Sequence, residues 1–250
     1  MRMDWVDLLF MHWPIPAAVV RPLIPADLEI DTYTGEGFER QAFIGVVPFL
    51  MTRVRGRVCP PIPTTHTFPE LNVRTYVLGP DGRPGVWFFS LDAASVLAVK
   101  AARATYRLPY RHAAMSIRRE GEWVVYESRR TDRRDPGAVF EARYAPAGPG
   151  YRAAAGSLEH FLTERYCLYA PGRGRWSLRA EIHHAPWPLR PARAEVVRNT
   201  MTAPLGIDLA EAARTSKGTG GPWPLLHFAD RLDEVVAWPA WPVGAGKSSR

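Results

Sequence analysis

The sequence predicts a mainly β (α+β) fold, in which antiparallel strands form one barrel-like sheet with a few helices. Runs of β-branched and aromatic residues recur at short intervals, on the order of ten in all, and clusters of Gly, Pro and Asp separate them. Helical patterns are few and do not alternate regularly with the strands, which disfavours a parallel sheet flanked by helices. At 250 residues, such a barrel commonly forms a single domain. We therefore expect one domain over residues 1–243 and a flexible tail over residues 244–250.

Local patterns predict the elements in chain order. Prolines frame a short helix at residues 17–23, Asp92 is the expected N-cap of an Ala-rich helix at 93–106, and Ser157 caps a helix at 157–166. Residues 51–69, basic and then rich in proline, predict an ordered loop, and residues 217–221 a flexible connection rather than a phosphate-binding loop. The expected strands lie at residues 5–13, 40–50, 71–78, 85–91, 113–119, 122–129, 138–144, 177–184, 195–199 and 233–238.

Composition excludes several classes of function. The net charge is +7, but the cations are scattered and form no basic stripe, so we expect no nucleic-acid partner. No run approaches the roughly 18 apolar residues that cross a bilayer, and His12 and Pro14 interrupt the apolar start that a signal peptide would need. We therefore expect no membrane partner. Cys59 and Cys167 are the only cysteines and lack metal or redox spacing, which favours a cytoplasmic location.

A metal site is not expected either. His183 and His184 are adjacent, and neighbouring residues of a strand point to opposite faces, so the two rarely bind one ion. No third ligand follows at a useful spacing. The sequence therefore predicts neither a metal nor a cofactor.

Residues 68–115 carry the chemistry that the sequence indicates. Glu70 is an isolated carboxylate at the start of a predicted hairpin, and the polar run Tyr110-Arg111-His112 directly follows the helix that Pro109 ends. The hairpin and the helix could bring these groups together. Arg74 lies four residues along the same strand and so shares a face with Glu70. His12, between large apolar residues, is either a bonded core histidine or a cavity-lining one.

Five segments of the chain carry a family resemblance: PADLEID at residues 25–31, FPELNVRTYV at 68–77, PGVWFFSLDA at 84–93, LPYRHA at 108–113 and FLTERYCLY at 161–169. They resemble the acetoacetate decarboxylase-like superfamily, and especially its uncharacterised YqjF-like branch, a domain of unknown function. The resemblance covers nearly the whole chain for the branch and the N-terminal half for the decarboxylase. It implies a cone-shaped, largely antiparallel barrel with an internal cavity, and the superfamily is often oligomeric, so a homo-oligomer is also expected.

The resemblance carries over to the site only in part. The decarboxylase has a catalytic glutamate just before the hairpin, where this chain has Glu70. It also has a Pro-Lys-Lys run after the helix, in which the first lysine forms a Schiff base and the second depresses its pKa. Here that place reads Pro109-Tyr110-Arg111. A phenol cannot form an imine and arginine stays protonated, so the resemblance implies a retained positive charge and a lost nucleophile. Lys100, within the helix, is either solvent-facing or a relocated amine.

Two classes of function remain open. The first is an enzyme of lyase or hydrolase type that acts on a small oxo-acid without an imine. The second is a non-catalytic protein that binds a small anionic or carbonyl ligand. A structural role competes with both, with Glu70 in an ion pair to Arg74 or Arg111. A guanidinium would lower the pKa of Glu70 and burial would raise it, so its direction stays open. The candidate catalytic residues are Glu70, Tyr110 and Arg111, and the candidate ligand-binding residues are His12, Arg74 and His112.

Overall fold

A computed structural model describes residues 1–35, 37–56, 66–172, 176–216 and 222–243. The predicted connection at 217–221, the tail at 244–250 and residues 57–65 of the proline-rich stretch lie outside the described residues. The helical elements are α1 (Ala17–Val20), η1 (Arg21–Leu23), α2 (Val96–Tyr106), α3 (Leu158–Thr163), η2 (Ala203–Leu205) and α4 (Leu209–Thr215). The strands are β1 (Arg2–Ile15), β2 (Glu29–Ile30), β3 (Tyr33–Gly35), β4 (Phe38–Arg55), β5 (Phe68–Leu78), β6 (Pro84–Ala93), β7 (Tyr110–Glu120), β8 (Trp123–Arg130), β9 (Val139–Pro146), β10 (Cys167–Ala170), β11 (Leu178–His183), β12 (Arg190–Asn199), β13 (Leu225–Ala237) and β14 (Trp241–Pro242).

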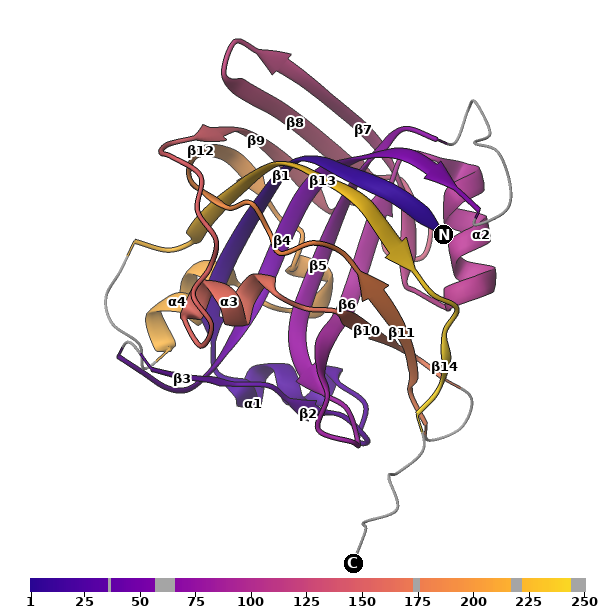
Figure 1. The fold of residues 1–250 in the computed structure, drawn as a ribbon, viewed down its shortest axis with the longest axis vertical. Coiled ribbons are helices and arrows are strands. Elements are labelled where there is room, and N and C mark those ends of the chain that lie inside the picture. Colours follow the sequence, from indigo (N-terminus) through magenta and orange to yellow (C-terminus); the bar gives the residue numbers. More distant parts are fainter. Residues whose placement is uncertain (36, 57–65, 173–175, 217–221, 244–250) are drawn as a thin grey trace, which may run out of the picture.

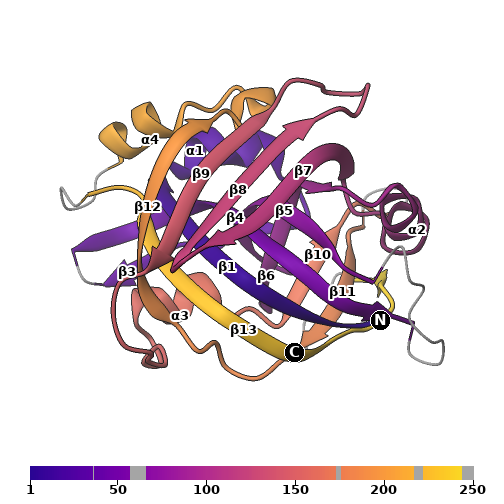
Figure 2. The ribbon, with the colours of Figure 1, turned by 90° about the horizontal axis from the view of Figure 1, so that it is seen from above.

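The strands close into two rings that share one wall. The small ring runs β6-β10-β11-β13-β1-β4-β5, and the large ring runs β6-β7-β8-β9-β12-β13-β1-β4-β5. Seen from above, the shared strands β1, β4 and β5 lie between β7–β9 on one side and α3 on the other (Figure 2). Among the described residues only β6–β7 and β6–β10 pair in parallel, so the predicted antiparallel barrel is confirmed with these two exceptions.

Each ring encloses its own apolar core, because the shared strands are buried on both faces. On β1, for example, Leu9 and Met11 belong to the core of the large ring, whereas Leu8 and Phe10 belong to that of the small ring. Successive side chains of a strand point to opposite faces, so a strand between two cores reads as a continuous apolar run. This explains why the LLFMHW segment of β1 and the QAFIGVVPFL segment of β4 show no polar alternation.

Helices cover the ends and the open side of the rings (Figure 1). α1 lies at the lower end, and the β7–β8 hairpin projects beyond the upper end, where Gly121 adopts the positive φ of 62° that its turn requires. Ser157 caps α3 by accepting a hydrogen bond from the His160 N–H, which confirms the predicted cap. α3 faces the interior of the small ring, since the Leu162 carbonyl accepts from the Tyr76 hydroxyl at 2.6 Å.

Three local predictions are wrong for identifiable reasons. Asp92 does not cap a helix, because its carboxylate is buried in β6 against Arg130, and α2 begins only at Val96. Residues 51–55 are not loop but the end of β4, where Arg53 pairs with Asp4 of the neighbouring strand. α4 was not expected at all, although Asp208 accepts from the Ala210 and Glu211 N–H groups as an N-cap does.

Candidate functional site

The inner face of β5 carries a row of polar side chains into the small ring. Leu71, Val73 and Val77 belong to the core of the large ring, so the residues that alternate with this face of β5 point into the small ring. These inward-facing residues are Glu70, Asn72, Arg74 and Tyr76, and all four are buried. Buried polar groups are costly unless they are bonded, and so many on one strand face mark the candidate site.

Glu70 and Tyr110, two of the predicted catalytic residues, meet on this face. The Tyr110 hydroxyl donates to Glu70 Oε2 at 2.9 Å. Only 3% of the Glu70 surface is exposed, and Tyr110 is buried as well. The pairings of β6 explain the meeting, because they set Ala93 beside Glu70 of β5 and Leu91 beside Tyr110 of β7.

Burial raises the pKa of Glu70 from 4.5 to about 8. The hydrogen bond from Tyr110 opposes this rise, and the nearby charge of Asp92 adds to it. The carboxyl is therefore mostly protonated at neutral pH. Burial, together with the charge of Glu70, also raises the pKa of Tyr110 well above its usual value, so the phenol remains a hydrogen-bond donor.

Arg111 does not join this pair. It follows Tyr110 on β7 and points to the opposite face, where its Nε donates to Asp135 Oδ1 at 2.5 Å. The expectation that Arg111 places a positive charge beside Glu70 is therefore wrong. Within the described ranges Glu70 has no ion pair, so the structural alternative, a pair with Arg74 or Arg111, is not observed either.

A buried ion pair lies on the far side of the same wall. Arg130 Nη2 donates to Asp92 Oδ1 at 2.7 Å and to Ser90 Oγ at 2.8 Å, and the two charged side chains are only 1% and 0% exposed. Arg130 Nη1 also contacts Asp135, which joins this pair to Arg111. The sequence did not reveal this pair, because Asp92 was expected to cap a helix.

Arg74 and His12 lie side by side further along the inner wall. Both flank Gly45 of β4, where an added Cβ would lie 3.2 Å from His12 Nε2 and 3.4 Å from Arg74 Cγ. His12 Nε2 is 2.6 Å from the Tyr76 hydroxyl, and the Arg74 guanidinium lies over the Phe10 ring at 5.2 Å. Burial, and then the Arg74 charge, hold the pKa of His12 well below its usual value, so its imidazole is neutral.

The remaining candidates lie outside this interior. His112 Nδ1 is 2.9 Å from Thr131 Oγ1 at an exposed position, so the expectation that it binds a ligand with Glu70 finds no support in its contacts. Lys100 is exposed on α2, as an ordinary surface lysine is. Two inward-facing residues were missed, Asn72 and His227. Asn72 could have been recognised from the period-two spacing of polar residues after Glu70, whereas His227 gives no comparable signal.

The described residues contain no group of three or more His, Cys, Asp or Glu side chains that could hold a metal ion. Among the same residues, no helix has the length and apolar character needed to cross a membrane.

Comparison with known proteins places the chain in a family. The sequence pattern of DUF2071, described as an uncharacterized conserved protein, matches residues 2–233. The chain belongs to the DUF2071 family. The chain is also similar to the uncharacterized protein YqjF of Bacillus subtilis (strain 168), to which it is 43% identical over 239 residues, covering 96% of this chain and 90% of that protein. This confirms the YqjF-like resemblance noted in the sequence.

Solved structures share the fold of this DUF2071 chain at low sequence identity. The enduracididine biosynthesis enzyme MppR with bound HEPES buffer has a TM-score of 0.61 at 9% identity, over 99% of this chain and 89% of that one. An acetoacetate decarboxylase-like enzyme from Sphingomonas wittichii RW1 has a TM-score of 0.60 at 12% identity, over 97% of this chain and 92% of that one. The chain therefore has the acetoacetate decarboxylase-like fold.

Proposed function

We propose that this DUF2071 protein binds and transforms a small carboxylate or carbonyl compound inside the small ring, without forming an imine. The observation that carries the proposal is the buried Tyr110–Glu70 hydrogen bond of 2.9 Å. A carboxyl group suits general acid–base catalysis when its pKa is raised toward neutrality and a neighbouring hydroxyl, here that of Tyr110, orients it.

Glu70 has two uses in such a reaction, depending on its protonation. With a pKa of about 8 it is mostly a neutral acid at pH 7 and can donate a proton to oxygen or carbon of the ligand. The conjugate carboxylate can take a proton from a carbon next to a carbonyl group, which forms an enolate. Tyr110, whose own pKa is raised, can donate a hydrogen bond to Glu70 or to an oxygen on which negative charge develops.

The chemistry differs from that of the decarboxylase that the sequence resembles. Tyr110 stands where that enzyme has its imine-forming lysine, and a phenol cannot replace an amine there. Lys100, the one lysine among the described residues, is exposed on α2. MppR has been crystallised with the condensation product of pyruvate and imidazole 4-carboxaldehyde, so small oxo-acids are the compounds that we would test first.

Proton exchange in deuterated buffer tests the proposal directly. The protein is incubated with pyruvate or with acetoacetate, and proton NMR follows both loss of the proton next to the carbonyl and formation of product. We expect the wild type to accelerate one of these processes, Glu70→Gln to abolish the acceleration, and the exposed-site control Glu29→Gln to retain it. Equal rates in the wild type and Glu70→Gln would contradict general acid–base catalysis by Glu70.

A non-catalytic binding protein is the second candidate. It is favoured because Tyr110 occupies the position of the decarboxylase's imine-forming lysine. Such a protein would keep the polar interior of the small ring and lose the nucleophile of the parent reaction. Calorimetry with the same compounds separates the two functions, because the binding protein gives heats of binding without exchange or product at any pH.

A further inference from the structure

The Arg74 guanidinium is buried without a carboxylate partner. Only 9% of the Arg74 surface is exposed, and no ion pair of Arg74 occurs in the part of the chain that the structure describes. Its protein contacts are weak: the Leu162 carbonyl and the Tyr76 hydroxyl both lie 3.4 Å from Nη2, and Nε has no partner. Removing a cation from water is unfavourable unless an opposite charge compensates it. This position therefore calls for an anion.

A neighbouring arginine shows how the fold satisfies a buried guanidinium when the protein supplies the anion. Arg165 also lies over the Tyr76 ring, at 4.8 Å from its centre. Arg165 Nη1 donates to Asp31 Oδ2 at 2.5 Å, and its Nε donates to the Phe161 carbonyl at 2.7 Å. Two buried arginines thus contact one tyrosine, and only Arg165 has a carboxylate among the described residues.

Three more buried polar atoms without partners lie on the same inner wall. They are His12 Nδ1, Asn72 Oδ1 and His227 Nδ1. The strand pairings place them on adjacent rows: His12 and Arg74 both flank Gly45 of β4, while His227 lies beside Phe10, and Asn72 beside Val47. Buried polar atoms normally have a hydrogen-bond partner, so four such atoms on one wall, without a protein partner in the described ranges, offer hydrogen bonds to a polar ligand.

The hydrogen-bond network assigns a role to His12. The single hydroxyl proton of Tyr76 goes to the Leu162 carbonyl, which can only accept, so the Tyr76 oxygen must accept from His12 Nε2. The neutral imidazole then presents an unprotonated Nδ1. The wall therefore offers a cationic donor at Arg74 and an acceptor at His12, a set that fits an anion carrying a hydroxyl or enol group.

We infer that Arg74, His12, Asn72 and His227 form a binding site for the carboxylate end of a small hydroxy- or oxo-acid. The inference rests on the proposed function, since it supplies the substrate class for the acid–base pair at Glu70. The Cα atoms of Glu70 and Arg74 are about 13 Å apart along the strand, at roughly 3.3 Å per residue, a distance that the two side chains and a short-chain acid span together.

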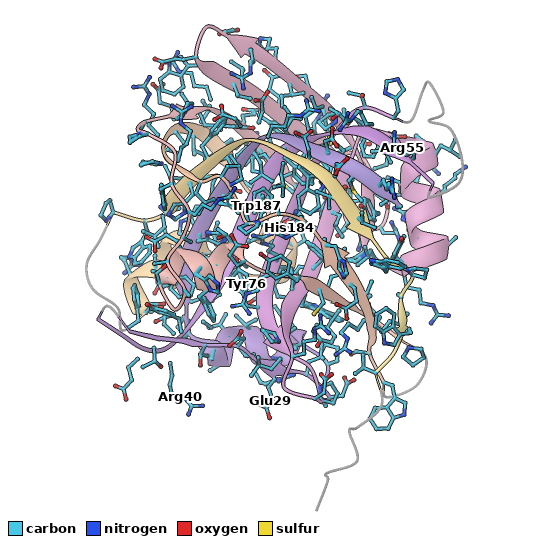
Figure 3. All side chains as sticks on the ribbon, viewed as in Figure 1. Glu29, Arg40, Arg55, Tyr76, His184 and Trp187 are labelled. Carbon is cyan, nitrogen blue, oxygen red and sulfur yellow. The ribbon has the colours of Figure 1, made fainter. Side chains whose placement is uncertain are left out.

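Aromatic rings pack beside the Arg74 guanidinium. Phe10 lies under the Arg74 guanidinium, and Trp187 packs edge-on against Phe10 at 4.9 Å between ring centres. Trp187 and Tyr76 lie toward the middle of the molecule, in contrast to Glu29 and Arg40 at its lower edge (Figure 3). A cation held against apolar and aromatic surface binds a carboxylate more strongly than the same cation in water, because little solvent screens the pair.

The test compares acids with their neutral amides. Calorimetry and thermal unfolding are measured with pyruvate, lactate and acetoacetate, and with pyruvamide and lactamide, on the wild type, Arg74→Gln and Arg143→Gln. Arg143 is the matched control, since it is an exposed arginine paired with Glu195. We expect at least one acid to bind and stabilise the wild type and the control, the amides to bind at least about 30-fold more weakly, and Arg74→Gln to lose that factor or more.

Each outcome bears on a different part of the reasoning. The inference is overturned if none of the acids stabilises the wild type, or if acid and amide bind equally. It is also overturned if Arg74→Gln binds the acids as the wild type does. If Arg74→Gln does not fold, the inference is tested by the wild type alone, through its preference for each acid over the matching amide. Carboxylate binding that needs Arg74 but gives no proton exchange supports the binding site and refutes the proposed enzyme. Proton exchange that needs Glu70 but not Arg74 supports the enzyme and refutes the binding site.

Discussion

Replacement of Glu70 by glutamine should make the protein more stable at alkaline pH. In the folded protein the carboxyl keeps its proton up to a pKa of about 8, whereas the ordinary value of 4.5 holds once the chain unfolds. Between these two values the folded state binds more protons than the unfolded state, so stability falls as pH rises. Below pH 4.5 both states are protonated and the group costs nothing; above pH 8 the loss is complete.

The size of the effect follows from the shift in the pKa of Glu70. Each pKa unit corresponds to about 1.4 kcal/mol, so the shift from 4.5 to about 8 corresponds to roughly 5 kcal/mol of unfolding free energy. Glutamine has the same shape, never ionises and can still accept from Tyr110. The two proteins should therefore have similar stability near pH 4.5, and Glu70→Gln should gain steadily from there to pH 8.

Urea unfolding followed by circular dichroism across this pH range measures the difference between the two proteins. The difference is needed because His12 and His227, whose pKa values burial lowers, act in the opposite direction below about pH 6.5. Glu29→Gln serves as the exposed control and should show no such trend. A difference that stays flat with pH, or that favours the wild type more at high pH, would refute a buried, protonated Glu70.

Three further outcomes are expected. Tyr110→Phe should lower the unfolding free energy by about 1 kcal/mol and raise the pKa of Glu70 further, because it removes the one hydrogen bond that lowers it, and a repeat of the pH series would show the shift. Borohydride reduction in the presence of acetoacetate or pyruvate should trap no adduct, since Lys100 is exposed; a mass increase that maps to Lys100 would restore the Schiff-base mechanism. Arg130→Met should destabilise the protein by roughly 3–5 kcal/mol in urea unfolding, because it leaves Asp92 as an unpaired buried charge, and a loss below about 1 kcal/mol would contradict this.

Sequence patterns and the family resemblance were sufficient to predict the barrel and both members of the candidate pair. Short β-branched runs and turn clusters indicate strands, and these local signals survive in the fold because each strand buries at least one apolar face. Glu70 stood out as an isolated carboxylate next to such a run, which needed only neighbours in the chain. Tyr110 stood out as the residue at the decarboxylase's lysine position, which needed the resemblance.

Local patterns could not settle which charges meet across the wall. Tyr110 and Arg111 are adjacent, and only the parallel pairing of β7 with β6 decides that Tyr110 faces Glu70 and Arg111 faces Asp135. Asp92 has the sequence context of a helix cap, yet its burial against Arg130 outweighs the capping preference, which is worth about 1 kcal/mol.

The strand pattern, the family resemblance and the position of the Glu70 carboxylate were therefore predictable from the sequence. The environment of that carboxylate is set only by the tertiary structure. The pKa of Glu70 depends on complete burial, and the exposed or buried state of a strand residue depends on the ring that closes around it. The same closure pairs Arg165 with Asp31 and brings no carboxylate of the described residues to Arg74, because ion pairing over long chain distances is fixed only when the strands and α3 come together.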